Sequence, residues 1–445
     1  MICDKSPTAV AAAPSELLHP PWLLASATRS GTASLSKLWP WAADPRSQNG
    51  SEHALLAQGD LVVATPATPS SADARPQVAA EIMDVDIDSH GNYIHTLAIR
   101  SAGQPAAESE QQADLPPSRR NLVLTHGYFS GVGYFFRNYR DLSQVEGWDV
   151  YAIDWLGMGR SSRPAYKSRR QDGEDVRVAH AEQFFVESLE EWRKRMRIDK
   201  MTLCGHSFGG YMSALYALKY PQHVEKLVLI SPIGLPEAPP DLDERLKQGY
   251  GPAPGRSTTP PSPSDLASGA SNKSTADTTA APAAKPSMQR LLLFRTAISL
   301  WDRNYTPQWA IRSAGPFGRR LIDMYIQRFT WLTDAQRAAL AAYAHQISVL
   351  PASSESALND ILRPAAYARR PLVNRLDGLA MPTIFMYGSH DWVDHAGGQE
   401  VIRRLAGRVV SRLHRVPHAG HNLHLENPSD FNRLLIAEMA KDPDV

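Results

Sequence analysis

Ser207 stands in the pattern Gly-His-Ser-Phe-Gly at residues 205–209, where an apolar run breaks into a turn of small residues. Residues 202–204 are predicted to end a buried strand, and residues 211–218 to lie in the helix that follows. A serine at such a strand-to-helix turn is held at the carboxyl edge of a sheet, where its hydroxyl can attack a carbonyl carbon. The pattern therefore predicts a nucleophile, which needs partners before it indicates catalysis.

The residues that flank this serine suit such a turn. Gly205 and Gly209 are expected to lack a side chain because neighbouring backbone comes too close for a Cβ at either position. His206 is expected to support the turn. The backbone N–H of Phe208 is a candidate for one half of an oxyanion hole, the pair of donors that stabilises a negative oxygen during acyl transfer.

The other half of the oxyanion hole is predicted in residues 125–131 (THGYFSG), which directly follow a buried strand. Gly127 permits a turn in which a backbone N–H approaches the substrate, and the donor we expect is the N–H of Tyr128. His126 and Gly127 are therefore predicted to support the site. Losing one such donor typically lowers the rate about a hundred- to a thousandfold.

A catalytic acid is predicted in residues 387–394 (YGSHDWVD), after a strand at residues 383–386. A carboxylate there can hold an imidazole in one tautomer and stabilise its cation. Asp391 is preferred because it follows the strand end at the usual distance. Asp394 is expected instead to cap the next helix.

The general base is predicted in residues 417–428 (PHAGHNLHLENP), where three histidines compete. His421 follows Gly420, whose tight turn can aim the ring back at the serine, so His421 is the predicted base. His418 and His424 are expected behind the site or at the surface.

Strand and helix patterns place these segments at one sheet edge. Residues 81–87 and 93–99 alternate polar and apolar side chains and predict an antiparallel hairpin at an edge of the sheet. Helices then separate most of the short apolar runs, which predicts an α/β fold with a mostly parallel sheet covered on both faces. These runs, expected to be buried strands, are residues 122–124, 150–153, 201–204, 227–230 and 383–386.

Counting the two hairpin strands, the sixth and seventh predicted strands are residues 227–230 and 383–386. The alternation of strands and helices stops between them. Residues 250–286 are rich in Pro, Ser, Thr, Ala and Gly and hold few large apolar side chains, so we expect disorder there. An aromatic, helical region follows and is predicted to form a cap over the sheet. The predicted organisation is a flexible, mostly irregular leader at 1–75, a core at 76–232, a cap at 233–375 that includes the insertion at 250–286, and a second part of the core at 376–445.

Composition excludes several classes of partner. The formal net charge is +1, from 47 basic and 46 acidic side chains, which gives no reason to expect nucleic acid. Cys3 and Cys204 are too few for a disulfide framework or a cysteine metal site, which fits a reducing compartment. We expect neither a metal nor a cofactor. No apolar run approaches the roughly 20 residues of a membrane span, so any membrane contact should be peripheral.

Trp22, Trp39 and Trp41 are unusual in a leader rich in Ala, Ser and Pro. The indole is apolar with one polar group and settles at membrane surfaces, so these residues are candidates for a membrane anchor. Packing of the rings on the core is the alternative. The leader has no secretory signal. A mitochondrial presequence stays open, because basic residues stand among Ser, Thr and Ala while acidic residues interrupt the pattern.

The chain resembles the α/β-hydrolase superfamily, in which the nucleophile, acid and base follow in the order Ser207, Asp391, His421. Within it, the chain is similar to the α/β-hydrolase-domain proteins four and five and to the mitochondrial cardiolipin-specific deacylases. Further segments carry the likeness, at residues 154–164 (DWLGMGRSSRP), 185–193 (FVESLEEWR), 218–221 (LKYP) and 314–318 (AGPFG).

The resemblance implies an α/β-hydrolase fold, with a helical cap between the sixth and seventh strands, and an acyl lipid as substrate. It also implies a peripheral location at a membrane or lipid droplet. The mitochondrion is the first expectation, and the lipid droplet, endoplasmic reticulum or cytoplasm are alternatives. Relatives carry a proposed acyltransferase signature of a histidine, four residues and an aspartate. Here Glu426 stands in place of the aspartate, which weakens the transferase reading without removing it.

The first expectation is a serine lipid acyl hydrolase that opens its acyl-enzyme with water, as a phospholipase or cardiolipin deacylase does. One alternative is a lysophosphatidic acid acyltransferase that shares the acyl-enzyme. Another is a non-catalytic lipase coactivator at a lipid surface. Some coactivators of this subfamily lack the nucleophile, so the presence of Ser207 favours an enzyme.

Overall fold

A computed structural model describes residues 50–63, 78–100, 119–169, 171–248, 292, 295–296, 298–301 and 303–442. The three leader tryptophans and the insertion at residues 250–286 lie outside the described residues. The predictions made for them, an interfacial anchor and disorder, therefore stay predictions.

The described residues contain a nine-stranded sheet in the order β1-β2-β3-β5-β4-β6-β7-β8-β9. Within it β3 runs opposite to the other strands, so the predicted mostly parallel sheet is confirmed. The strands are β1 (Leu61–Val63), β2 (Val78–Asp86), β3 (Tyr93–Ile99), β4 (Arg120–Thr125), β5 (Trp148–Ile153), β6 (Met201–His206), β7 (Val224–Ile230), β8 (Thr383–Gly388) and β9 (Ser411–Val416).

The predicted hairpin is present as β2 and β3, with Gly91 at a φ of 82° in its turn. It does not form the edge of the sheet, because β1 pairs with β2 on its outer side. β1 and helix α1 (Gly50–Ala57) belong to residues that the sequence assigned to an irregular leader. Leu55, Leu56 and Leu61 are buried there, so this part of the chain packs on the core.

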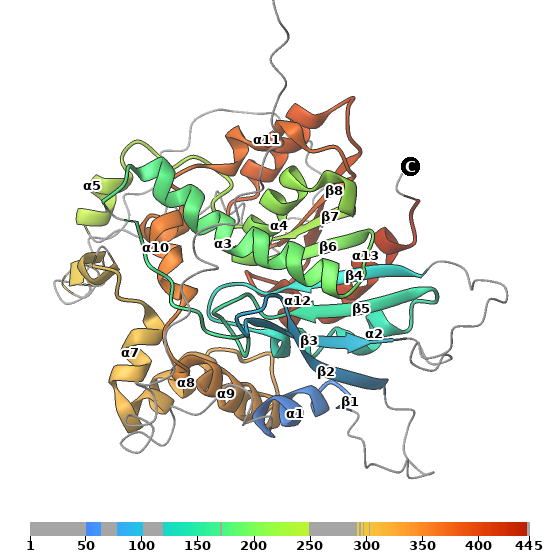
Figure 1. Ribbon diagram of the computed structural model, residues 1–445, viewed down its shortest axis with the longest axis horizontal. Coiled ribbons are helices and arrows are strands. Elements are labelled where there is room, and N and C mark those ends of the chain that lie inside the picture. Colours follow the sequence, from blue (N-terminus) through green and yellow to red (C-terminus); the bar gives the residue numbers. More distant parts are fainter. Residues whose placement is uncertain are drawn as a thin grey trace, which may run out of the picture.

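Helices cover both faces of the sheet (Figure 1). On one face, α3 (Glu174–Arg195), α4 (Phe208–Lys219) and α11 (Ala396–Leu405) contribute to one apolar cluster. On the other, α2 (Tyr139–Ser143), α12 (Leu423–Glu426) and α13 (Pro428–Met439) contribute to a second cluster. Central strands such as β6 are buried along their whole length, which agrees with their apolar sequence.

The cap lies between β7 and β8, as predicted. Its described helices are α5 (Leu242–Lys247), α7 (Pro307–Ser313), α8 (Gly318–Ile326), α9 (Asp334–Val349) and α10 (Ala357–Ile361). Thr333 begins α9 with a capping box, in which its hydroxyl accepts from the N–H of Gln336. Figure 1 shows α7, α8 and α9 grouped at one end of the molecule beside α1.

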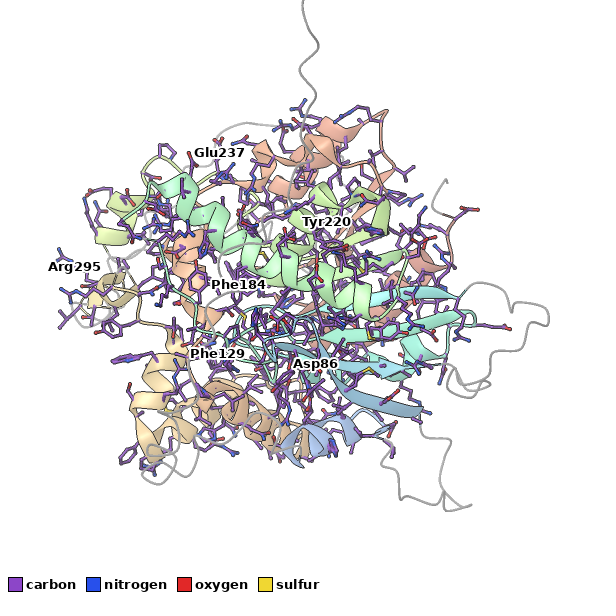
Figure 2. The ribbon with its side chains drawn as sticks, in the orientation of Figure 1. Asp86, Phe129, Phe184, Tyr220, Glu237 and Arg295 are labelled. Carbon is purple, nitrogen blue, oxygen red and sulfur yellow. The ribbon has the colours of Figure 1, made fainter. Side chains whose placement is uncertain are left out.

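The cap contacts the core through aromatic side chains. Figure 2 shows Phe129 between the sheet and the cap helices, and its ring stands edge-on to that of Tyr325 with 6.1 Å between the centroids. Among the described residues, no helix combines the length and the apolar character needed to cross a bilayer.

Candidate active site

Ser207 forms a strained turn between β6 and α4. Its φ of 55° and ψ of −116° are unfavourable for a residue with a side chain. A Cβ added at Gly205 would lie 2.5 Å from the carbonyl oxygen of Gly209, and one added at Gly209 would lie 2.5 Å from the carbonyl oxygen of Thr125. The geometry therefore excludes a side chain at both positions, as the sequence predicts.

The structure brings Ser207, His421 and Asp391 together from three segments. The Oγ of Ser207 lies 3.0 Å from the Nε2 of His421, and the Nδ1 of that ring lies 3.1 Å from the Oδ1 of Asp391. With its proton on Nδ1, the imidazole donates to Asp391 and accepts from the serine hydroxyl. This arrangement can withdraw the serine proton as the oxygen attacks.

Asp391 is fixed by more than the histidine. The hydroxyl of Ser231 donates to its Oδ2, and the N–H of Val393 donates to its Oδ1 over 2.9 Å. Asp394 lies apart and accepts the N–H of Ala396, the first residue of α11. The structure thus separates the two carboxylates as the sequence predicts, one against the histidine and one at a helix start.

The turn after β4 lies against the serine. A Cβ added at Gly127 would come within 3.0 Å of the Cβ of Ser207, so glycine is required for this approach. The Nδ1–H of His126 donates to the Gly127 carbonyl over 2.7 Å, and the hydroxyl of Ser130 donates to the same oxygen over 2.8 Å. In a trans peptide the N–H points opposite to the C=O of the same peptide bond. Because the Gly127 C=O faces His126, the N–H of Tyr128 points away from His126.

Both predicted oxyanion donors are unbonded in the part of the chain that the structure describes. Among the described residues no acceptor is found for the N–H of Tyr128 or for that of Phe208, the first residue of α4. Both residues adjoin Ser207, one through the Gly127 turn and one along the chain. The two N–H groups are therefore available for the oxygen of a bound acyl group.

Asp154 supports this turn, a role that sequence reasoning does not predict beyond the family likeness. It directly follows β5, and its carboxylate accepts the N–H groups of Val132 and Arg160 over 2.7 Å each. Its Oδ1 also lies 3.5 Å from the Nε2 of His126, which accepts the N–H of Trp155. Burial lowers the pKa of His126, so the ring that holds the oxyanion turn is neutral.

A buried ion network continues from Asp154 to helix α1. The carboxylate of Glu52 lies 3.2 Å from the Nε2 of His95 and 3.2 Å from the Nε of Arg160. The Nδ1 of His95 lies 2.8 Å from Asp84. Burial alone would lower the pKa of His95, but the charge of Glu52 and the bonds to both carboxylates outweigh it and raise that pKa to about 10. The imidazolium therefore stays charged at neutral pH.

Glu426 holds the loop that carries the histidine. Its Oε2 accepts the N–H of Gly420 over 2.6 Å, and its Oε1 accepts the N–H of Asn422 over 3.0 Å. The carboxylate thus binds the backbone on both sides of His421 and positions the base. The longer side chain of glutamate, compared with aspartate, makes both hydrogen bonds here.

Behind the base, His206 and His424 are neutral, because burial lowers the pKa of both rings. The Nε2 of His206 donates to the His421 carbonyl over 3.0 Å, and its ring stands edge-on to that of His424 with 4.6 Å between the centroids. Burial, followed by the charge of His421, lowers the pKa of His424 to about 3. His418 adopts a φ of 53° in the preceding turn. His421 alone of these contacts the serine hydroxyl.

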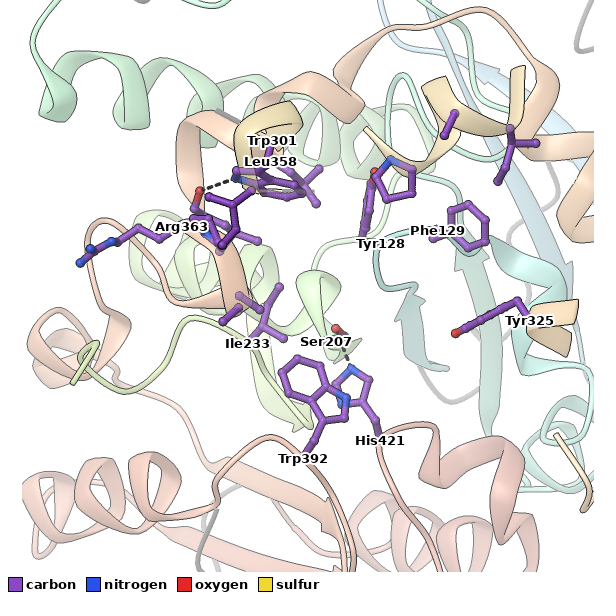
Figure 3. Close-up of a pocket in the computed structure, with 18 of the residues that line it drawn as sticks. Tyr128, Phe129, Ser207, Ile233, Trp301, Tyr325, Leu358, Arg363, Trp392 and His421 are labelled. Atoms are coloured by element: carbon purple, nitrogen blue, oxygen red, sulfur yellow. Dashed lines mark hydrogen bonds between the residues drawn. The ribbon is translucent and has the colours of Figure 1, made fainter. Parts of the chain in front are cut away.

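A cavity of about 710 Å³ opens over the serine. Figure 3 shows Ser207 and His421 facing each other, Trp392 against the histidine, and Phe129 and Tyr325 on another side. Most of the other lining side chains are apolar and come from the cap, among them Ile298, Trp301, Ile311, Leu321, Ile322, Leu358 and Leu362. A space of this size and polarity suits an acyl chain. Among the described residues, no group of His, Cys, Asp and Glu is arranged to hold a metal ion.

Comparison with known proteins gives consistent matches. Residues 120–428 match the family described as the alpha/beta hydrolase fold. The chain is 30% identical over 339 residues to the "Probable 1-acylglycerol-3-phosphate O-acyltransferase" of rice (Oryza sativa subsp. japonica), covering 75% of this chain and 70% of that protein. It is 31% identical over 321 residues to "1-acylglycerol-3-phosphate O-acyltransferase ABHD5" of rat (Rattus norvegicus), covering 71% and 76%. A similar solved structure is a bromoperoxidase from Bacillus anthracis, 15% identical, with a TM-score of 0.49 and coverage of 81% and 100%.

Proposed function

The chain belongs to the α/β-hydrolase family, and on that basis we propose that it transfers an acyl group to 1-acylglycerol-3-phosphate through an acyl-enzyme at Ser207. One observation carries the proposal: the Oγ of Ser207 lies 3.0 Å from His421 at the floor of an apolar cavity. The residues alone favour water as the acceptor. The names of the relatives favour the transferase alternative.

In the first step the Oγ of Ser207 attacks the carbonyl carbon of an acyl donor such as an acyl-CoA. His421 takes the serine proton on Nε2, and Asp391 stabilises the imidazolium through Nδ1. The N–H groups of Tyr128 and Phe208 hold the oxyanion. The intermediate collapses, the carbon–sulfur bond breaks, and the thiolate leaves with the proton from His421.

In the second step the free hydroxyl of 1-acylglycerol-3-phosphate attacks the ester on Ser207. His421 removes the hydroxyl proton, and the same two N–H groups stabilise the second oxyanion. When the intermediate collapses, the proton returns to the serine oxygen and phosphatidic acid leaves. The enzyme is restored, and water is not consumed.

Hydrolysis is the second candidate, and access to the base favours it. Trp392, which packs on His421 with 4.7 Å between ring centroids, is 47% exposed. A water molecule that reached the acyl-enzyme along this side would release a fatty acid by the same chemistry. The two functions therefore share one site and differ in the acceptor.

Incubation of the purified chain with an acyl-CoA and 1-acylglycerol-3-phosphate tests the proposal. We expect phosphatidic acid to form, and Ser207→Ala to lower its rate by at least about a thousandfold, because the nucleophile is lost. Phosphatidic acid formation that survives Ser207→Ala contradicts the proposal. Release of free fatty acid alone, dependent on Ser207, assigns the chain to the hydrolase alternative.

A further inference from the structure

The cap exposes an apolar face on its helix α8. Phe317, Leu321, Met324 and Tyr325 are 62%, 44%, 69% and 39% exposed, and we call these four residues the α8 face. Phe317 directly precedes the helix with helical backbone angles, and the others follow at spacings of three or four residues or adjoin one another. The four side chains therefore lie on one side of the helix.

The same helix has a second apolar face, which is buried. Ile322 and Ile326 are each 1% exposed and join the cluster that includes residues of α9. Through these residues α8 packs on the core. Leu321 and Tyr325 also line the cavity, but neither this lining nor the packing on the core explains why Phe317 and Met324 are apolar and exposed. A contiguous exposed apolar patch on a protein marks a contact with something else.

The α8 face is continuous with the mouth of the cavity above Ser207. Leu321 and Tyr325 belong to the face and also line the cavity. Figure 3 shows Tyr325 and Trp392 on different sides of the cavity, and Trp392 is also largely exposed. An apolar molecule held against the α8 face would therefore reach the serine without crossing a polar surface.

On α8 and just after it, the exposed charges beside the face are basic, while Glu426 of α12 also acts electrostatically on Tyr325. Arg320 lies on α8 at the border of the α8 face, and Arg328 is the second residue after the helix, in line with the face; both are exposed. Asp323, the acidic residue of this helix, points away and pairs with Arg319 over 2.8 Å. Long arginine side chains can place their charge at lipid phosphates while their stems cover apolar surface. This combination fits an anionic phospholipid surface.

We propose that the α8 face docks on an anionic phospholipid surface and turns the mouth of the cavity toward it. The role of the cavity rests on the proposed function, whereas docking does not. The occupant is a lipid surface because the face joins exposed apolar side chains, basic side chains and an apolar cavity large enough for an acyl chain.

Flotation of the full chain with vesicles tests the docking. Phosphatidylcholine vesicles are compared with vesicles that also contain phosphatidylserine, using the double variant Phe317→Glu/Met324→Glu. Neither residue lines the cavity. The matched control is Val410→Glu, because Val410 is 37% exposed and directly precedes β9, at the opposite edge of the sheet. We expect the double variant to bind anionic vesicles at least about tenfold more weakly and the control to bind normally.

Binding by the double variant that equals that of the unaltered chain overturns the proposal, because another segment then makes the contact. Equal binding of the unaltered chain to both kinds of vesicle overturns the assignment of an anionic surface. Loss of binding in both variants alike also contradicts a specific role of α8. A fluorophosphonate probe that labels Ser207 equally in all three proteins shows that they are folded. Absence of labelling in all three would count against the proposed function and leave the vesicle result standing.

A fluorescent label at position 324 gives an independent readout. The chain has two cysteines, of which Cys204 is buried and Cys3 can be replaced by serine. In that Cys3→Ser background, Met324→Cys or Val410→Cys supplies an exposed thiol for an environment-sensitive dye. We expect anionic vesicles to shift the emission to the blue at position 324 and not at 410. No shift, equal shifts, or a blue emission already present without vesicles overturns the proposal. The last result shows that the chain itself or a second copy covers the face, and light scattering separates those two cases.

Discussion

At the carboxyl edge of the sheet, polar side chains of the site are held by hydrogen bonds from neighbouring segments, whereas in the cap the cavity is bounded by apolar side chains that partly face solvent. Asp391 takes bonds from His421, Ser231 and Val393. Tyr325, in the cap, contacts Phe129 through ring edges and is 39% exposed. The edge thus fixes the geometry of the reaction, and the cap decides what reaches it. Substitutions at the edge should change kcat, and those in the cap should change KM.

The largest effect is expected for Asp391→Asn. The amide keeps the shape of the side chain but favours the wrong imidazole tautomer, so kcat should fall by about ten thousandfold with little change in KM. Steady-state kinetics of acyl transfer measure both constants. Asp394→Asn is the matched control and should keep its activity, because Asp394 caps α11. Equal losses in both variants would show that the two carboxylates share the role.

The buried ion network predicts the next effect, on stability. Glu52→Gln leaves Arg160 and the Nε2 side of His95 without a carboxylate, which should lower the free energy of unfolding by about 3–5 kcal/mol. Urea denaturation measures this change. Asp60→Asn, which breaks the exposed pair with Arg140 nearby, should cost less than about 1 kcal/mol. A Glu52→Gln variant as stable as the control would show that α1 is not held by its charge.

In the cap, Ala310→Trp should reduce the space for the acyl chain. Ala310 lines the cavity yet lies at the surface, so the larger ring can be placed without disturbing the core. KM for a long-chain acyl donor should rise by about tenfold, while a short-chain donor is turned over as before. Ala406→Trp, on the exposed end of α11, controls for the added ring. A fall in kcat for both donors would place this part of the cap in the reaction itself.

The smallest effect is a dependence of stability on pH. The pKa of His95 is raised in the fold from its ordinary value of 6.5 to about 10. Its contribution to stability is therefore complete below pH 6.5 and is lost as the pH rises toward 10. The melting temperature should fall across this window by several degrees, and less in Glu52→Gln. Asp84, Asp154 and Arg160 also face this group. A melting temperature that is flat from pH 6.5 to 10 would contradict a charged His95.

Sequence reasoning reached the local parts of the site. Ser207 and Asp391 each stand in a short pattern directly after a predicted strand, and His421 follows the tight turn at Gly420, so residue type and position are enough to select them. The same grounds separate Asp394 from Asp391. Glycines 205, 209 and 127 were also predictable, because the required backbone approach leaves a sequence signature.

The parts that sequence reasoning missed depend on contacts between distant segments. Glu52 lies in a stretch rich in Ala and Ser, and nothing near it indicates a partner at His95 or Arg160. The sequence does not predict β9, because its alternation of polar and apolar residues is short. Asp154 was accessible in principle, since a carboxylate directly after a buried strand is expected to have a partner. Its partners at residues 126, 132 and 160 are not visible without the fold.

The central claim is that Ser207 receives the acyl group. Mass spectrometry of the chain, quenched in acid after mixing with an acyl-CoA, tests it most directly. The account predicts an added mass equal to the acyl group on the peptide that contains Ser207, absent in Ser207→Ala and removed by 1-acylglycerol-3-phosphate as phosphatidic acid forms. Phosphatidic acid formation without any acyl adduct on Ser207, at a rate unaffected by Ser207→Ala, would contradict it. An unmodified serine that also resists a fluorophosphonate probe would instead support the non-catalytic alternative.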